Sequence, residues 1–188
     1  TLFPYTTLFR SLIDTVEEEF YDTMMERIRS VIGERTIDNV IVQHAEPDHS
    51  GGFLKFMKDY PNARPYASNA GVSIMLKQYF KSYDFQRVKT GDTLSTGRYT
   101  LTFVEMPMIH WPDNMLTYVA EQKIAFSNDA FGQHIASYDI FDDAHGAAKC
   151  IDRAKDYYAN IVMPYGMQVA NKLKQIQDMN LEDRKSVV

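Results

Sequence analysis

Two hydrophobic periods alternate along the first part of the chain. Apolar residues recur at the spacing of an amphipathic helix from Val16 to Ile32, and Gly33 suits the end of such a helix. Short β-branched and apolar runs, which favour strands, lie before and after this helix, and helical spacing returns ahead of Pro61. The predicted elements follow in this order: strand 12–15, helix 16–33, strand 37–42, helix 53–60, strand 64–67 and helix 68–79.

The pattern changes after the third predicted helix. From Phe85 to Phe126, short alternating stretches are separated by polar turns at 90–92, 95–97 and 121–123, which predicts an antiparallel meander. The last helical stretch, 146–181, contains a proline and a glycine near its middle, so it predicts two helices rather than one. A β/α half, a meander and further helices together predict an α/β sandwich, with two sheets face to face and helices outside.

Composition narrows the class of protein. The chain has 188 residues, of which 45% are hydrophobic, and this is enough for one ordinary core. It has neither an apolar run long enough for a membrane span nor a signal-peptide pattern, so we expect a cytoplasmic location and no membrane partner. Cys150 is the only cysteine, which excludes an intrachain disulfide. The net charge of −5, without Lys or Arg clusters, argues against nucleic acid and favours a small substrate.

Both ends of the sequence look foreign to the rest. Residues 1–11 resemble the in-frame translation of a common high-throughput sequencing adapter, and residues 183–188 resemble the same adapter family read in the other direction. We therefore expect both ends to be adapter-derived artefacts and the natural insert to span residues 12–182, as part of a larger domain. The alternative is a genuine aromatic N-terminal segment together with a polar tail.

The loop after the second predicted strand concentrates metal-ligand side chains. In extended backbone His44 and Glu46 point the same way, because side chains alternate along a strand. Pro47 then turns the chain, so that Asp48 and His49 open the next helix. Any one of these residues alone would be an ordinary loop residue or a helix cap. Four together would leave charge uncompensated without a cation, so the loop predicts a metal site.

This loop resembles the metallo-β-lactamase superfamily signature His-x-[His/Glu]-x-Asp-His. Zinc hydrolases of that superfamily have histidine at the third position, whereas flavodiiron proteins have glutamate, as this chain does at Glu46. A carboxylate in place of an imidazole adds negative charge and a harder oxygen donor, which suits two redox-active irons better than zinc. The chain thus resembles a flavodiiron protein, which implies a metallo-β-lactamase-like αββα sandwich that is incomplete at both ends.

Two downstream segments, 108–115 and 126–134, extend the resemblance. Alone, His110 could be a loop histidine held by Asp113, and Asp129 could be a turn residue. Their order and spacing after the first motif match those of the family. The resemblance implies that one iron is bound by His44, Glu46 and His110 and the other by Asp48 and His49. It also implies that Asp129 bridges the two irons.

Other features of the family are weaker here or lie outside the chain. Trp111 and His134 are candidates for pocket residues or hydrogen-bond partners behind the ligands, because metal sites need such outer contacts. The family completes the second iron with a further histidine near the end of this domain, but no histidine follows His145. The resemblance therefore places that ligand, and the flavodoxin-like domain that binds FMN, outside this chain.

The resemblance implies a reductase of small gases. In the intact protein two iron ions would reduce dioxygen to water, nitric oxide to nitrous oxide, or both, with electrons from FMN and no catalytic residues beyond the metal ligands. A rubredoxin-like or flavin-linked donor would reduce the flavin. A head-to-tail homodimer would bring the flavin of one subunit to the irons of the other, so we expect the fragment alone to be inactive.

Two alternatives stay open. The first is a zinc-dependent hydrolase of the same superfamily, in which metal-bound hydroxide attacks an ester or amide, and Glu46 argues against it. The second is a non-catalytic oxygen sensor that uses the same diiron domain. Only the flanking sequence distinguishes the sensor from the enzyme.

Overall fold

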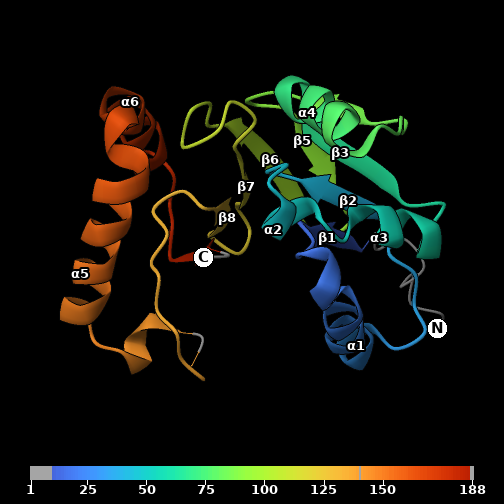
Figure 1. The fold of residues 1–188 in the computed structure, drawn as a ribbon, viewed down its shortest axis with the longest axis horizontal. Coiled ribbons are helices and arrows are strands. Elements are labelled where there is room, and N and C mark those ends of the chain that lie inside the picture. Colours follow the sequence, from blue (N-terminus) through green and yellow to red (C-terminus); the bar gives the residue numbers. More distant parts are fainter. Residues whose placement is uncertain (1–9, 140, 187–188) are drawn as a thin grey trace.

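The protein is described by a computed structural model for residues 10–139 and 141–186. Two β-sheets pack face to face, and helices cover the outer side of each sheet (Figure 1). This is the αββα sandwich that the sequence predicts, and it arises because each element has one apolar face that must be buried against another layer.

The first sheet is formed by the β/α half of the chain. Its four strands are parallel and adjacent in chain order: β1 Ser11–Ile13, β2 Asn39–Val42, β3 Arg64–Ser68 and β4 Gln86–Val88. Parallel neighbours need a crossover connection, which explains the alternation of strands and helices in the sequence. The helices of this half are α1 Tyr21–Ile32, α2 Pro47–Ser50, α3 Phe53–Asp59 and α4 Asn69–Tyr79, with a 3-10 turn Glu18–Phe20 before α1.

Local signals explain where two of these helices begin and end. α1 ends at Gly33, whose φ of 62° is readily available to glycine, and the sequence predicts this end. α4 begins after Ser68, whose side-chain oxygen accepts a hydrogen bond from the backbone N–H of Gly71. The apolar faces of α1, α3 and α4 meet the sheet in a core that includes Met25, Phe53 and Phe56.

The second sheet has five strands in chain order: β5 Thr93–Ser95, β6 Thr100–Glu105, β7 Met115–Val119, β8 Ile124–Asn128 and β9 Asp183–Ser186. β5 to β8 form the expected antiparallel meander, and β9 runs parallel to β8. The expectation that the meander starts at Phe85 was wrong, because β4 pairs in parallel with β3 in the first sheet. A strand of three residues is too short for its alternation to reveal which sheet it joins.

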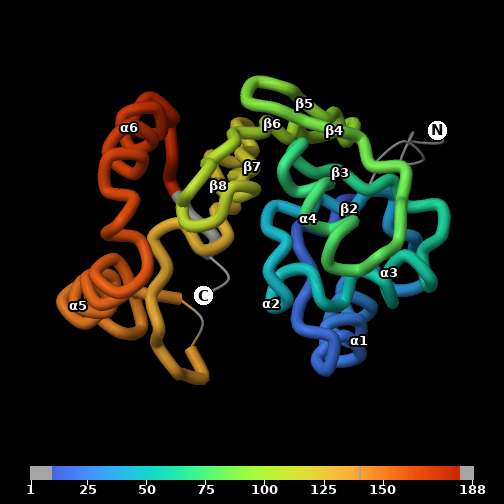
Figure 2. Tube along the Cα trace, turned by 45° about the horizontal axis from the view of Figure 1, so that its top comes forward, coloured from blue at the N-terminus to red at the C-terminus, as the bar shows by residue number. Residues whose placement is uncertain are grey.

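The outer side of the second sheet is covered by two helices, α5 Ala147–Tyr157 and α6 Gly166–Gln177, as the sequence predicts. Short helical turns surround and connect them: Asp142–Ala144, Tyr158–Val162 and Met163–Tyr165. Figure 2 shows α5 and α6 together, on the opposite side of the molecule from α1 to α4. The two sheets meet through Ile41, Phe103 and Met115, which are fully buried between them.

The ends of the chain lie partly outside the described residues. Residues 1–9 and 187–188 are not described, so the proposed boundaries at 1–11, 12–182 and 183–188 stay predictions. Ser11 pairs with Asn39 in the first sheet, and the backbone of Asp183–Ser186 pairs with β8. Within 10–139 and 141–186, no helix is long and apolar enough to cross a membrane.

Candidate metal centre

Three loops and the short helix that follows one of them supply the predicted ligands, and each loop follows a strand of the sandwich. His44 and Glu46 lie between β2 and α2, and Pro47 occupies the first turn of α2, as expected. Asp48 and His49 lie within α2. His110 belongs to the β6–β7 loop, and Asp129 directly follows β8. Because β2 belongs to one sheet and the other two loops to the second, the packing of the sheets brings these residues together.

Asp129 lies at the centre of this cluster. Its Oδ1 is 2.7 Å from Nε2 of His49, and its Oδ2 is 3.2 Å from Nε2 of His110. Nε2 of His44 lies 3.4 Å from the same Oδ2. The two oxygens of one buried carboxylate therefore face different histidines, which is the geometry that a bridging ligand requires.

The ligand atoms fall into two groups that share Asp129. Within each group every ligand atom lies within 4.8 Å of the others, and the groups are His44, Glu46, His110 and Asp129, and Asp48, His49 and Asp129. These are the two sets that the resemblance predicts, and the second has one residue fewer than the first. A buried oxygen of Asp48, Oδ1, has no hydrogen-bond partner among the described residues. Such an oxygen is costly to bury unless a cation or water satisfies it, so the residues fit a metal site.

The electrostatics of the metal-free cluster reflect this crowding. Burial acts to lower the pKa of His44, but contacts with Asp113 and Asp129 outweigh it and raise the pKa to about 9. Burial also acts to lower the pKa of His49, and contacts with Asp129 and Asp14 raise it to about 10. Burial would raise the pKa of the Asp129 carboxyl, yet the three histidines hold it well below its usual range. Protons on the histidines thus balance the carboxylates when metal is absent.

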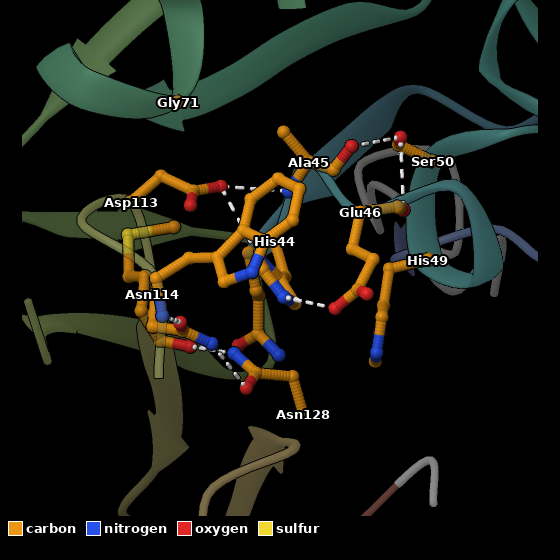
Figure 3. A network of polar contacts seen from close by, with 12 residues as sticks. His44, Ala45, Glu46, His49, Ser50, Gly71, Asp113, Asn114 and Asn128 are labelled. Carbon is orange, nitrogen blue, oxygen red and sulfur yellow. Dashed lines mark hydrogen bonds and ion pairs between the residues drawn. The ribbon is translucent and has the colours of Figure 1, made fainter. Parts of the chain in front are cut away.

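Two further carboxylates lie behind the histidines. Oδ2 of Asp113 accepts a hydrogen bond from the backbone N–H of Ala45 and lies 3.4 Å from Nδ1 of His44 (Figure 3). Asp14 Oδ2 lies 3.6 Å from Nδ1 of His49, slightly beyond hydrogen-bond distance. Both aspartates are buried. The alternative in which Asp113 holds His110 was wrong, because Asp113 faces His44. No ligand motif in the sequence includes Asp14.

A pair of asparagines orients the loop that carries Asp129. Asn114 donates from its side-chain amide to Oδ1 of Asn128, which also accepts from the backbone N–H of Asp129. Asn128 in turn donates to the carbonyl of Met115 and has a φ of 45°, a left-handed conformation that asparagine tolerates. Taken alone, Asp129 could have been a turn residue, and the sequence could not show that two asparagines hold its loop in place.

The two weaker candidates lie in different places. The ring of Trp111 is half-buried and meets the ring of His44 edge to face, with 5.1 Å between centroids. His134 is exposed and contacts Tyr157 instead, with ring centroids 5.2 Å apart. Trp111 therefore packs against the ligand cluster, whereas the ring contact of His134 is with Tyr157.

Tyr157 is a further neighbour of the cluster. Its side chain is buried at the end of α5. Burial raises the pKa of its hydroxyl, and the negative charges of Asp129, Glu46 and Asp48 raise it further. This places a neutral phenol beside the carboxylates, although no motif in the sequence links α5 to the ligand loops.

An αββα sandwich with adjoining groups of metal ligands at its loops defines a metallo-β-lactamase-like domain. The family model described as "ODP family beta lactamase" matches residues 8–183, and the chain belongs to this family. In sequence it is 40% identical over 173 residues to a nitric oxide reductase of Moorella thermoacetica, which covers 91% of this chain and 43% of the relative.

Solved structures agree with this assignment. The rubredoxin oxygen:oxidoreductase of Desulfovibrio gigas has a TM-score of 0.89 and 34% identity, over 94% of this chain and 45% of that one. The flavodiiron protein of Giardia intestinalis has a TM-score of 0.88 and 29% identity, over 94% of this chain and 43% of that one. The resemblance to flavodiiron proteins is therefore confirmed. The chain spans less than half the length of these three proteins.

Proposed function

We propose that this chain carries most of the diiron site of a flavodiiron oxidoreductase that reduces dioxygen, nitric oxide or both. The observation that carries the proposal is the position of Asp129, whose two oxygens face different groups of ligand atoms. A carboxylate in this position can hold two ions close together. We propose that His44, Glu46 and His110 bind the first iron, and that Asp48 and His49 bind the second. Asp129 would bind both.

The donor set supports iron. Three imidazoles and three carboxylates supply nitrogen and hard oxygen donors, and Glu46 stands where the hydrolases of the superfamily have histidine. When bound, the two irons would supply electrons and open coordination positions for the gas. The protein's own part is to hold the ligands and limit water. His44 is fully buried beneath Trp111, while Glu46 remains partly exposed and leaves the site open on one side.

The residues of this chain also control protons at the site. His44 and His49 can bind metal through Nε2 only when that nitrogen has no proton. Because their pKa values in the metal-free chain are about 9 and about 10, metal binding at neutral pH must release these protons. Asp129 already binds no proton at neutral pH, so it can bridge without deprotonation.

The proposed route of electrons follows from two relatives of this chain. One solved relative is named a rubredoxin oxygen:oxidoreductase, and a similar sequence is named a nitric oxide reductase. We propose that FMN in a domain outside this chain passes electrons to the irons, and that a rubredoxin-like or flavin-linked donor reduces the flavin. A head-to-tail homodimer and a cytoplasmic location stay predictions.

The test uses a protein extended beyond residue 182 by the rest of its gene. Iron and zinc contents are measured by elemental analysis, and consumption of dioxygen and of nitric oxide is followed with electrodes during supply of a reducing system. We expect about two irons per chain and consumption of at least one gas. An Asp129→Asn variant should lose both metal and activity, whereas His145→Ala, outside the cluster, should keep both.

The two alternatives give different results in the same experiment. If the zinc form cleaves an ester, thioester or lactam while the iron form consumes neither gas, the protein is a hydrolase. If the iron form binds the gas but does not turn it over with any reductant, and signalling sequence flanks the domain, the protein is a sensor. Either result would contradict the proposed reductase.

A further inference from the structure

We propose that the buried carboxylates of Asp113 and Asp14 are positioning residues that each determine the affinity of one of the two metal positions. The proposal rests on the proposed metal site. Asp113 would serve the position that contains His44, and Asp14 the position that contains His49. Neither aspartate belongs to the two groups of ligand atoms.

Asp113 is held where it can orient His44. Its Oδ2 is 2.7 Å from the backbone nitrogen of Ala45 and 3.4 Å from Nδ1 of His44. Figure 3 shows the imidazole of His44 between Asp113 on one side and Glu46 on the other. Nε2 of His44 lies 3.1 Å from Oε2 of Glu46. A proton on Nδ1 would therefore face Asp113 and leave Nε2 free to face the ligand cluster.

Asp14 is held in the corresponding position for His49. Its Oδ1 accepts a hydrogen bond of 2.7 Å from the backbone N–H of Gln43, and its Oδ2 lies 3.6 Å from Nδ1 of His49. Thr15 fixes the backbone of the same histidine, because both its N–H and its hydroxyl donate to the His49 carbonyl. Nε2 of His49 points to Oδ1 of Asp129, so this imidazole also lies between an outer carboxylate and the cluster.

The backbone on either side of His44 anchors both carboxylates. Gln43 donates to Asp14 and Ala45 donates to Asp113, so one stretch of chain after β2 fixes the two outer partners. These N–H donors also help to offset the cost of burying two negative charges. Asp14 comes from the end of β1 and Asp113 from the β6–β7 loop. The metal position that contains His49 therefore has its outer carboxylate from the first sheet, and the position that contains His44 has it from the second sheet.

The chemistry follows from the two nitrogens of an imidazole. A histidine that binds a metal through one nitrogen must hold its proton on the other, and a carboxylate that accepts this proton fixes the tautomer and strengthens the metal bond. Loss of such a partner commonly lowers metal affinity by about 10-fold to 100-fold. Because each aspartate faces a different histidine, each loss should affect mainly one metal position.

The test is a titration of the metal-free chain with Co²⁺ under anaerobic conditions, followed by calorimetry and visible absorption. We expect two binding events in the unchanged chain. Asp113→Asn and Asp14→Asn should each weaken one of them, by about 10-fold to 100-fold. Asp59→Asn removes a carboxylate that contacts Tyr21, away from the cluster, and should leave both events unchanged.

Double variants assign each aspartate to its position. His110→Ala removes a ligand of the first group only, so Asp113→Asn should add little to it, while Asp14→Asn should still weaken the remaining event. Asp48→Ala removes a ligand of the second group only. In this background Asp14→Asn should add little, while Asp113→Asn should still weaken the remaining binding event. If each aspartate weakens both events equally in every background, the assignment is overturned.

A second measurement needs no substitution and does not depend on folding of the variants. Nitrogen NMR of the Zn²⁺-loaded chain reports which imidazole nitrogen carries the proton. We expect His44 and His49 to carry it on Nδ1, and a proton on Nε2 in both would overturn the proposal. A chain that binds no Co²⁺ would contradict the proposed metal site as well. If both Co²⁺ binding events keep their affinity in Asp113→Asn and in Asp14→Asn, only the role of the two aspartates is contradicted.

Discussion

Asp129 belongs to both groups of candidate metal ligands. Asp129→Asn keeps the size of the side chain but removes the charge that faces three histidines. We expect affinity at both metal positions to fall by more than about tenfold, because each loses a charged ligand. Elemental analysis after gel filtration measures the bound metal. Unchanged binding at one position would show that Asp129 is not shared.

Glu46 should determine which metal the cluster prefers. Glu46→His exchanges an oxygen donor for a nitrogen donor and creates the pattern of the zinc hydrolases, so we expect the ratio of bound zinc to bound iron to rise severalfold. The measurement is metal content after anaerobic loading with equal Fe²⁺ and Zn²⁺. The matched control is Glu34→His on the exposed surface. An unchanged ratio would remove the main argument for iron.

The buried histidines should make the metal-free chain sensitive to alkaline pH. Their folded-state pKa values, about 9 for His44 and about 10 for His49, exceed the ordinary value of 6.5. The folded chain therefore keeps protons that the unfolded chain releases, and folding becomes less favourable as pH rises. This stabilisation is complete below about pH 6.5 and is lost as pH rises through the two folded-state values.

Thermal unfolding in the presence of a chelator measures this dependence. We expect Tm to fall between about pH 7 and about pH 10. A His44→Gln, His49→Gln double variant lacks both groups, so its Tm should fall less over the same range. An equal slope in the two proteins would mean that other groups cause the pH dependence.

Among the elements, α5 and the loop after β8 fit closely at Gly132. A Cβ there would lie 2.9 Å from the ring of Tyr157 and 3.3 Å from the carbonyl oxygen of Asp129. Gly132→Ala should therefore destabilise the fold by about 1–3 kcal/mol, the usual cost of overpacking. Urea unfolding measures the loss. In a Tyr157→Ala background the same substitution should cost much less, and an equal cost there would exclude this contact as the cause.

The helices α1 and α4 were predictable because each has a local signal. Apolar residues recur at helical spacing from Val16 to Ile32, and α1 ends at Gly33. Ser68 provides the N-cap of α4. The short strands were less predictable. Gln86 and Arg87 are exposed and only Val88 is buried in β4, so nothing in its three residues indicated a parallel partner in the other sheet. Pairing between strands is a long-range contact, and a single strand carries little information about it.

For the whole molecule, the proposed origin of the ends makes a testable prediction. Deleting residues 1–11 and 183–188 should change the free energy of unfolding and the metal affinity by less than about 1 kcal/mol. The described contacts of Arg10 are near the surface, including an ion pair of 3.8 Å with Asp38, and exposed pairs contribute little. Urea unfolding and the Co²⁺ titration provide the measurements.

The opposite result is also informative. The backbone of Asp183–Ser186 pairs with β8, so its removal leaves an open sheet edge beside the strand that leads to Asp129. If deletion of 183–188 alone unfolds the chain or abolishes metal binding, this strand belongs to the natural fold. A genomic read that continues through these residues with different codons would lead to the same conclusion.

The sequence by itself indicated the candidate ligand residues, the order of the layers and the resemblance to flavodiiron proteins. These features are local or follow a fixed spacing along the chain, so they can be recognised from the amino-acid sequence. The closely spaced residues His44, Glu46, Asp48 and His49 are an example. Only the tertiary structure decided that Asp113 and Asp14 lie behind the two buried histidines.

The physical reason is separation along the chain. Asp113 lies 69 residues from His44, and Asp129 lies 80 residues from His49, so these contacts exist only after two sheets have packed face to face. An aspartate next to a strand or in a turn has many ordinary roles, and its sequence neighbours do not distinguish them. Burial between layers restricts its partners, and here it directs each carboxylate to one imidazole.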